Sequence, residues 1–393
     1  MRTDPLKVAI VGCGAAFEFL HREPLRFAAR KGWLRVIAVA DPDNSRRAQA
    51  TKSFSLSTGY ASSKELFRGE PDVDFTIVMS PPPLHESDCL EAFAAGSHVL
   101  CEKPLASTFD SAARIDAAAR ASNRILAVGM TRRFYPAVLK LKGLLEQLPA
   151  DSDVRFLYRM CGVYNWRVAS EAPFRRNTSG GGVLLDSGVH LTDTLGYMLG
   201  WGHTTGAWDD ATIGGVEANS VVELRLGRGR GRLHLSWDTT AESALHLHVD
   251  GQQYWMPVAS IDTLYHRNSS GAQWEKLPMD AEWPTDLRAT GPLLAAPRSH
   301  SECVKFQLVD ALRAIRLGTP PAATGADGVA ALSLIHSAYQ MAQPLQMPWL
   351  SSEEQALLNA THWRASNPVG TNPSLLHIWP EVEQPNNLRF AQT

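Results

Sequence analysis

Residues 6–14 read Leu6-Lys7-Val8-Ala9-Ile10-Val11-Gly12-Cys13-Gly14, and this stretch decides the fold. Its apolar run predicts a buried strand, and the two glycines predict a tight turn into a helix that we expect to reach Arg30. A second apolar run, at 36–40, ends in Asp41. Glycines in the first turn and an acid at the end of the second strand are typical of a βαβ unit that binds a nucleotide.

The glycine turn predicts a cofactor site. Backbone N–H groups at the start of a helix attract a pyrophosphate, and glycines let it approach closely. The residues expected there are Gly12, Gly14, Ala15 and Ala16. Asp41 would accept a hydrogen bond from a ribose hydroxyl and repel the extra phosphate of NADP, so we expect the cofactor to be NAD. Phe17 stands at the third glycine position of the fingerprint, and Arg46-Arg47 is a competing signal for NADP.

Strands and helices continue to alternate as far as residue 131. We expect further strands at 74–79, 98–101 and 125–128 and a helix at 107–122. This alternation predicts a doubly wound parallel sheet. Beyond Pro136, a helix through Gln147 leads into strands with period-two apolar spacing. These strands, at 154–160, 221–226, 232–237, 244–250 and on to Met256, predict one large, mostly antiparallel sheet.

The predicted fold class is therefore α/β, in three parts. A dinucleotide-binding domain would take residues 1–131 and a substrate-binding and oligomerisation domain residues 132–350, while 351–393 would form a C-terminal extension. A loop-rich stretch at 265–299 precedes helices expected at 302–317 and 325–341. Arg228, Arg230 and Arg232 are expected in a solvated hairpin turn.

Composition favours a cytoplasmic enzyme. The chain has 393 residues, 44% of them hydrophobic, and a formal net charge of −2 with a pI near 6.7. This balance gives no electrostatic footprint for nucleic acid. The five cysteines are scattered without CxxC spacing, which argues against a disulfide framework or a zinc site. No apolar run reaches the ~18 residues of a membrane span, and the few residues before the first strand leave no room for a signal peptide.

Glu102-Lys103-Pro104 is the first chemical motif. It follows the strand expected at 98–101, which itself follows a helix ended by Gly96. Ligands of open parallel sheets bind outside the carboxyl ends of the strands, so a lysine held there by a proline is a candidate reactive group. Taken alone, the motif is an ordinary surface ion pair.

The second motif is the segment 180–193, in which three glycines precede Asp186, His190 and Asp193. A single helix would place the three side chains on nearly one face, where Asp186 would orient the imidazole of His190 and keep it basic. We expect that carboxylate to raise the pKa of His190. Two alternatives remain: a metal site, for which no fourth ligand is evident, and a structural helix with a core histidine. His246 and His248 lack an acidic companion and are assigned to structure.

Together with Ser80-Pro81 and His85, these motifs resemble the Gfo/Idh/MocA family, the relatives of glucose–fructose oxidoreductase and inositol dehydrogenase. The resemblance covers about residues 6–345 and includes Arg133-Phe134 and Asp327-Gly328. It implies a Rossmann domain followed by an α/β domain whose open sheet often forms homo-oligomers. It also implies hydride transfer between a nicotinamide cofactor and a ring hydroxyl of a sugar or cyclitol.

The resemblance also implies roles for single residues. Lys103 would hydrogen-bond the reacting oxygen beside the nicotinamide, His190 would accept the proton, and Asp186 would support it. The residues implied on the cofactor side are Ser80, Pro81, His85, Glu102, Lys103, Trp166 and Arg167. Pro82 stands where the family commonly has asparagine, and residues beyond 350 have no counterpart in the family pattern.

The substrate is predicted only as a class: a sugar, sugar acid, nucleotide sugar or cyclitol. The candidate substrate residues are Arg132, Tyr164, Asn177, Asp186 and His190. The arginines of this region, Arg175 and Arg176 included, are equally explained as surface charges. Two other functions fit the same residues. One is a redox-cycling NAD-dependent glycosidase or lyase; the other is a non-catalytic nucleotide sensor, which has no need of a proton-transfer set. No metal is expected.

Overall fold

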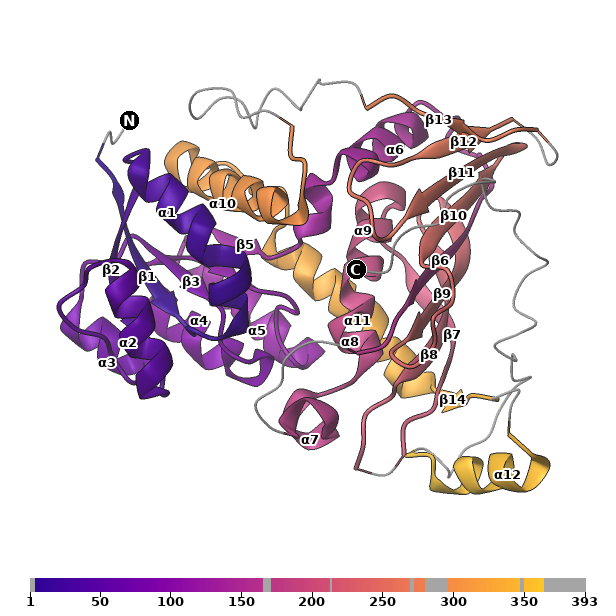
Figure 1. Cartoon of the computed structure of the whole chain (residues 1–393), viewed down its shortest axis with the longest axis horizontal. Helices are drawn as coiled ribbons and strands as arrows, with labels where there is room; N and C mark the ends of the chain where they lie inside the picture. The colour runs from indigo at the N-terminus through magenta and orange to yellow at the C-terminus, as the bar shows by residue number, and fades with distance from the viewer. Residues whose placement is uncertain are drawn as a thin grey trace.

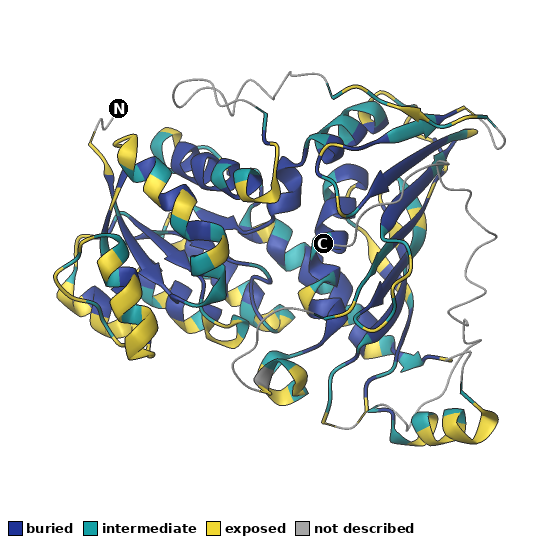
Figure 2. Ribbon diagram, in the orientation of Figure 1, coloured by how far each residue is buried: buried dark blue, intermediate teal, exposed yellow. Residues whose placement is uncertain are grey.

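Two sheets organise the chain, one in each half of the molecule (Figure 1). The computed structural model describes residues 4–164, 171–212, 214–268, 272–279, 296–346 and 350–363. Both sheets are largely buried, whereas the helices α2 (Asn44–Ser53) and α12 (Ser352–Thr361) lie at the surface (Figure 2). Among the residues just given, no helix is long and apolar enough to cross a membrane.

The first sheet has the order β2-β1-β3-β4-β5, with every pair parallel. Its strands are β1 (Leu6–Val11), β2 (Leu34–Ala40), β3 (Phe75–Val78), β4 (His98–Cys101) and β5 (Leu126–Val128). The connecting helices are η1 (Phe17–His21), α1 (Arg22–Arg30), α2, α3 (Ser63–Gly69), α4 (His85–Ala94) and α5 (Phe109–Ala121). The predicted doubly wound parallel sheet is confirmed.

Local sequence explains where several of these elements begin and end. Asp43, Ser62 and Thr108 each precede a helix, and their side chains accept hydrogen bonds from its first backbone N–H groups. Gly96 has a φ of +79°, which only glycine adopts at low cost, and it separates α4 from β4 as expected. β4 is apolar and largely buried, and it ends at Cys101. Glu102 and Lys103 come next in the chain and therefore lie at the carboxyl edge of the sheet.

The second sheet has nine strands in the order β13-β12-β11-β10-β6-β9-β8-β7-β14. They are β6 (Val154–Cys161), β7 (His203–Asp209), β8 (Asn219–Leu226), β9 (Gly229–Ser236), β10 (Ala244–Val249), β11 (Gln252–Pro257), β12 (Tyr265–Arg267), β13 (Glu275–Lys276) and β14 (Gln343–Pro344). All neighbours are antiparallel except β6–β9 and β7–β14. The predicted mostly antiparallel sheet is confirmed.

Two local expectations in this half were wrong. The loop-rich stretch at 265–299 was expected to interrupt the sheet, but it contains two short strands, β12 and β13, that extend the sheet. Arg230 and Arg232 were expected in a hairpin turn but lie in β9, where they pair with Asp153 and Glu223. Arg228 does lie at the turn. Its guanidinium donates to the carbonyls of residues 145, 148 and 149 instead of being solvated.

Helices that follow the first sheet in the sequence pack on the second sheet and against the first. α6 (Pro136–Glu146), α9 (Gly188–Leu199) and α11 (Gly325–Met341) cover the face of the second sheet that is turned toward the first (Figure 1). α11 contacts both α5 and β7. α10 (His300–Leu317) packs against α1, and its residues Leu308 and Leu312 belong to the core around β1.

Arg133 ties the end of the first sheet to the second half. It follows β5 in η3 (Thr131–Phe134), and its Nε and Nη2 donate to Asp193 of α9 over 2.6–3.1 Å. Its Nη2 also lies 3.2 Å from Asp327 of α11. Both Arg133 and Asp193 are buried. Asp193 is therefore a structural partner of Arg133 and does not share a site with His190, contrary to the expected common face.

Asp193→Ala is expected to lower the free energy of unfolding by about 3–5 kcal/mol, because it leaves a buried guanidinium without its main partner. Urea unfolding followed by circular dichroism measures this. Glu223→Gln is the matched control. It breaks the partly exposed Arg232 pair and should change the unfolding free energy by no more than about 1 kcal/mol. Equal effects of the two substitutions would contradict the assignment.

Candidate active site

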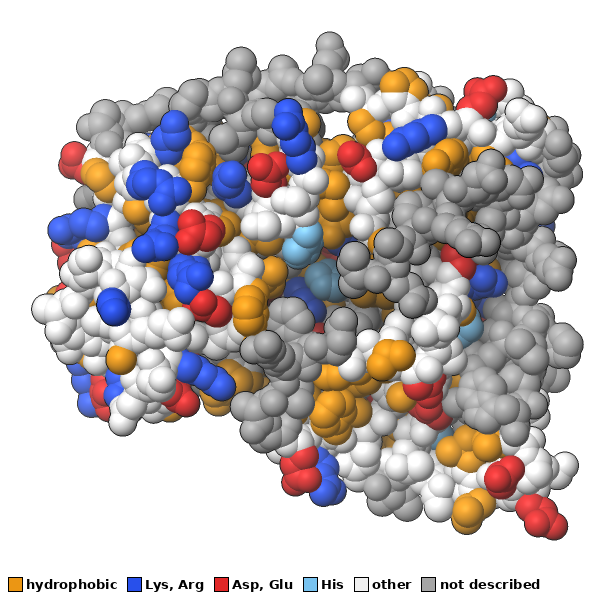
Figure 3. All heavy atoms as spheres, in the orientation of Figure 1, with side chains coloured by type: hydrophobic (Ala, Val, Ile, Leu, Met, Phe, Trp, Pro, Cys, Tyr) orange, Lys and Arg blue, Asp and Glu red, His pale blue; other side chains and the backbone are white. Residues whose placement is uncertain are grey.

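The candidate active site lies at the carboxyl edge of the first sheet. All of its strands are parallel, so the residues that follow β1 to β5 meet at this one edge, as ligand sites of such sheets do. The second half contributes the four-residue helix α8 (Val183–Asp186) and the helix α9 that follows it. Figure 3 shows histidine and basic side chains in the hollow between the two halves.

The glycine turn touches the neighbouring strand end. Gly12 has a φ of +89°, and a Cβ there would lie 2.4 Å from the backbone N of Ser80. Glycine is therefore required both for its conformation and for the close approach. The space at Gly14 is open: a Cβ there would have only the Arg46 guanidinium as a neighbour, at 3.7 Å.

Phe17 and His21 explain the departure at the third glycine position. The chain forms a π-helical turn over Phe17–His21. Phe17 is buried and packs against Phe54, with ring centroids 6.2 Å apart. The same turn carries His21 inward, where its Nε2 lies 2.6 Å from Oε1 of Glu102. No sequence signal marked His21.

The Asp41 carboxylate is fixed by backbone hydrogen bonds at the end of β2, where a nucleotide-binding βαβ unit has its acidic residue. One carboxylate oxygen accepts the backbone N–H of Cys13 at 2.7 Å, and the other accepts that of Asp43 at 2.8 Å. The carboxylate is thus fixed between the glycine turn and the end of β2. Arg47 donates to the backbone carbonyl of Asp41, whereas Arg46 lies beside the glycine turn.

Ser80, Pro81 and His85 form a support for the edge of the sheet. His85 is buried, with Nε2 2.7 Å from the carbonyl of Ser80 and Nδ1 3.0 Å from that of Pro104. It therefore joins the segments that follow β3 and β4. Burial lowers the pKa of His85, and the two carbonyls oppose that effect.

Glu102 is buried beside the lysine that follows it. Its Oε2 accepts the backbone N–H of Lys103 at 3.1 Å, and its Oε1 contacts His21. Burial alone would raise the pKa of this carboxyl, but the hydrogen bond and charge of His21, together with Lys103, hold it below its usual value. Glu102 is therefore an ionised, fixed group behind the lysine.

Lys103 joins the two halves at the site. Its Nζ donates to both the carbonyl oxygen and Oδ1 of Asp186, each at 3.1 Å. The Lys103 side chain is 21% exposed, so it is not sealed from solvent. An ammonium has three N–H donors, and these two bonds leave one for a ligand.

His190 has an environment opposite to the expected one. The segment 180–193 is not one helix: α8 ends at Asp186, and α9 begins at Gly188. Burial, then the positive charges of Lys103, Arg132 and His300, lower the pKa of His190 well below its ordinary value. The expected upward shift caused by Asp186 was therefore wrong, because Asp186 pairs with Lys103 instead.

Arg132 and His300 lie close enough to His190 for their charges to act on it. Arg132 is buried, donates to the phenol of Tyr158 at 3.3 Å, and has no carboxylate within ion-pair distance among the residues that the structure describes. It is therefore not a surface charge. His300 lies at the start of α10, and its Nδ1 is 2.8 Å from the Tyr135 hydroxyl. No local pattern marks His300, which comes from a helix distant in the chain.

The remaining candidate residues are placed as follows. Tyr164 packs against Trp237 with ring centroids 4.7 Å apart, and burial followed by the charge of Asp186 raises its pKa. Asn177 is exposed on α7 (Arg176–Ser179) and lines a cavity of about 630 Å³ that includes none of Lys103, Asp186 and His190. Trp166 and Arg167 lie outside the described residues.

The residues present fit a dinucleotide. Gly12 has the positive φ and the tight contact of a phosphate-binding turn, and an anion beside Gly14 would meet Arg46. Asp41 is fixed for a ribose hydroxyl. For a metal ion there is no comparable site: among the described residues no group of three or more histidine, cysteine and acidic side chains could hold one.

Comparison with known proteins identifies the first sheet. Residues 6–130 match the GFO_IDH_MocA model, described as "Oxidoreductase family, NAD-binding Rossmann fold". The family is NAD-binding, as predicted for this chain, and the preference for NAD over NADP stays a prediction. The apo form of a levoglucosan dehydrogenase superposes on the chain with a TM-score of 0.71, covering 86% of this chain and 98% of that one at 19% identity. The same enzyme in complex with NADH and levoglucosan gives 0.68. These likenesses confirm the fold.

Curated relatives extend the comparison. D-glucoside 3-dehydrogenase of Escherichia coli strain K12 is 32% identical over 249 residues, which are 62% of this chain and 65% of that protein. 1,5-Anhydro-D-fructose reductase of Ensifer adhaerens is 29% identical over 320 residues, 76% of this chain and 86% of that protein. The chain therefore matches slightly less than two thirds of the first relative's length.

Proposed function

We propose that the chain, whose residues 6–130 match the Gfo/Idh/MocA oxidoreductase model, is an NAD-dependent dehydrogenase of a ring secondary alcohol, or the matching ketone, in a sugar or cyclitol. The proposal is supported above all by the ion pair of Lys103 with Asp186, and by the charge of Lys103 that acts on His190, at the carboxyl edge of the first sheet. A protein that only bound the nucleotide would have no use for this set.

The chain's own groups supply the proton and the positive charge. NAD, when bound at Gly12, Gly14 and Asp41, supplies the acceptor for the hydride. Lys103 presents its remaining N–H to the substrate oxygen and stabilises the negative charge that develops there. Asp186 holds two of the three ammonium donors, so the third has a defined direction.

His190 is the proposed general base. Its pKa is well below the ordinary value, so the imidazole is neutral at neutral pH and can accept the hydroxyl proton. The cations that lower this pKa, above all Lys103, also favour the alkoxide. In ketone reduction the direction reverses, and the imidazolium would donate the proton.

The burial of Arg132 is the argument for an anionic substrate. A buried guanidinium without a carboxylate partner is costly, and a carboxylate or phosphate of the substrate would offset that cost. Burial, followed by the charges of Lys103, Arg132 and His300, lowers the pKa of His190, so Arg132 acts close to the reacting group. Sugar acids and nucleotide sugars are therefore the proposed substrates within the broader class.

The test is a panel of neutral polyols, sugar acids and nucleotide sugars, each incubated with enzyme and NAD⁺ while NADH absorbance is followed. We expect anionic members to give the highest kcat/KM. Arg132→Met should lower kcat/KM for them by about 10- to 100-fold while changing neutral polyols little. Failure of every member to form NADH would contradict the proposal. Products formed without net NADH would favour the redox-cycling glycosidase or lyase.

The preference for NAD over NADP is tested at Asp41. We expect NADH to bind more tightly than NADPH in a fluorescence titration, because the fixed Asp41 carboxylate repels a 2′-phosphate. Asp41→Ala should narrow the difference, leaving Arg46 to attract that phosphate. Asp43→Ala is the matched control, since Asp43 caps α2 and does not bond the glycine turn. Tighter binding of NADPH by the unaltered protein would refute the preference.

A further inference from the structure

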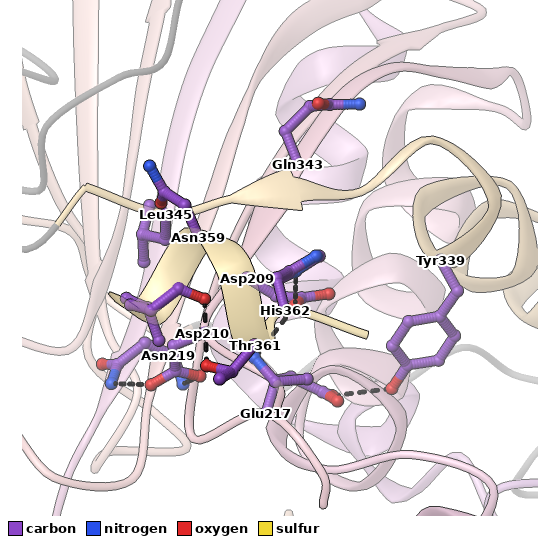
Figure 4. Close-up of polar contacts among 12 residues, drawn as sticks. Asp209, Asp210, Glu217, Asn219, Tyr339, Gln343, Leu345, Asn359, Thr361 and His362 are labelled. Carbon is purple, nitrogen blue, oxygen red and sulfur yellow. Dashed lines mark hydrogen bonds and ion pairs between the residues drawn. The ribbon is translucent and has the colours of Figure 1, made fainter. Parts of the chain in front are cut away.

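A cluster of polar groups lies where the C-terminal segment meets Asp209, Glu217 and Tyr339 (Figure 4). The C-terminal segment, meaning residues 351–363, consists of α12 followed by His362 and Trp363. The cluster also includes Asp209 of β7, Glu217 between β7 and β8, and Tyr339 of α11. None of these groups has a part in the mechanism above.

Glu217 holds α8 in place. Its side chain is fully buried, and its Oε1 accepts three hydrogen bonds: from the N–H of Gly182 at 2.9 Å, the N–H of Leu184 at 3.1 Å and the Tyr339 hydroxyl at 2.6 Å. Its backbone carbonyl accepts the N–H of Val183 at 3.0 Å. A Cβ on Gly182 would lie 2.1 Å from that carbonyl oxygen, so the two backbones are in contact.

These bonds act close to the reacting lysine. α8 has four residues, and the last of them is Asp186, whose Oδ1 and carbonyl accept the Lys103 ammonium. Leu184, which Glu217 holds, is two residues before Asp186. A shift of α8 would therefore displace the acceptors that direct Lys103.

The C-terminal segment completes the surroundings of Glu217. The second carboxylate oxygen of Glu217, Oε2, is buried without a hydrogen bond among the described residues. It lies 4.0 Å from Nη1 of Arg176. The Arg176 guanidinium is 3.7 Å from the ring centroid of Trp363 and 4.7 Å from that of Tyr339. Trp363 thus supplies one of the two rings that hold this cation against the carboxylate.

His362 anchors the segment. It is buried, with Nε2 2.8 Å from Oδ1 of Asp209, and the N–H of Trp363 donates to the carbonyl of Ala211 at 3.3 Å. Burial, and then the charge of Asp209, raise the pKa of Glu217 to about 7. His362 contacts Asp209, and the charge of Asp209 acts on Glu217. The C-terminal segment is therefore linked to Glu217 through Asp209.

We propose that residues 351–363 form part of the active-site scaffold: docked through His362 and Trp363, they hold Arg176 against Glu217 so that α8 presents Asp186 to Lys103. Glu217 is then a positioning residue that acts through α8. The proposal rests on the proposed function for the catalytic importance of Lys103, but the positional link itself is a property of the protein alone.

The link is tested by the reactivity of the Lys103 amine. The full chain, without substrate, is treated with trinitrobenzenesulfonate, and mass spectrometry follows labelling of Lys103 relative to the exposed Lys64. We expect Glu217→Ala and Trp363→Ala to label Lys103 about fivefold faster or more, since α8 loses hydrogen bonds or their support. Glu217→Gln keeps an acceptor oxygen and should stay near the unaltered rate. The matched control is Asp210→Asn, whose acid bonds Ala218 and Asn219 but not α8.

Activity provides a second readout. The two faster-labelling variants should lose kcat while the KM for NAD stays unchanged, because the cofactor residues lie on the first sheet. Unchanged Lys103 labelling in Trp363→Ala, or a faster rate in Asp210→Asn as well, overturns the proposal. If Glu217→Ala does not fold, Trp363→Ala at the end of the segment still decides. Absence of dehydrogenase activity in the unaltered protein would refute the proposed function alone, since the labelling experiment needs no turnover.

Discussion

Replacement of Lys103 by alanine is expected to lower kcat for alcohol oxidation by about 100- to 1000-fold, because it removes a prepositioned donor from the oxygen that becomes negative. The dissociation constant of NADH should change little, since the Lys103 ammonium bonds Asp186 in the second half and not the glycine turn. Steady-state kinetics and a fluorescence titration with NADH measure the two quantities separately.

Two companion variants sharpen this result. Lys103→Arg should restore little activity, because a planar guanidinium cannot place its charge where the compact ammonium lies. Asp186→Asn keeps an oxygen acceptor and should cost less than the loss of the amine. Similar losses of NADH affinity and of kcat in Lys103→Ala would mean that Lys103 chiefly holds the cofactor.

The parts of this site that the sequence predicts are those formed by neighbours in the chain. The glycine turn, Asp41 and Lys103 each follow directly on a short apolar strand, and parallel pairing brings these strand ends to one edge. The apolar strand pattern and the residues that flank it are therefore enough to locate these three features in the sequence. The pairing of Cys13 with Asp41 then follows from the βαβ unit itself.

The parts that the sequence does not predict depend on distant segments. Asp186 and His190 have helical spacing, but a break at Ser187 separates their helices, and Lys103 from the other half captures the carboxylate. Asp193 is likewise captured by Arg133. Spacing along a chain shows which side chains can meet, whereas the nearest opposite charge in the fold decides which do.

His21 and His300 illustrate the same limit. His21 reaches Glu102 only because a π-helical turn widens the start of the first helix. His300 lies at the start of a helix that follows the second sheet but packs against the first. Neither position has a local signal. The contact of His21 with Glu102 and the effect of His300 on His190 could be recognised only from the folded chain.

His190→Ala is expected to lower kcat for oxidation at neutral pH by about 100- to 10,000-fold, as loss of a positioned general base does. Binding of NADH should persist. The free-enzyme pH profile of the unaltered protein should show a plateau at neutral pH and an acid limb below the ordinary histidine value of 6.5, because burial and the cations Lys103, Arg132 and His300 lower the pKa. Below that pKa the imidazole is protonated and cannot accept the hydroxyl proton, so the rate of oxidation falls as pH falls.

The position of this acid limb identifies the base. Burial and the charge of Arg132 lower the pKa of His300 as well, so this imidazole becomes a cation only on the acid side. Its removal in His300→Gln should move the limb upward toward the ordinary histidine value, since less positive charge then opposes the His190 imidazolium. His190→Ala should abolish the limb altogether, and ketone reduction by the unaltered enzyme should show the opposite dependence. His336→Ala, on α11 and absent from the surroundings of His190, is the control and should leave the profile unchanged. An acid limb that persists in His190→Ala would assign the base role to another group. Tyr164, whose pKa burial and Asp186 raise, would be the next residue to test.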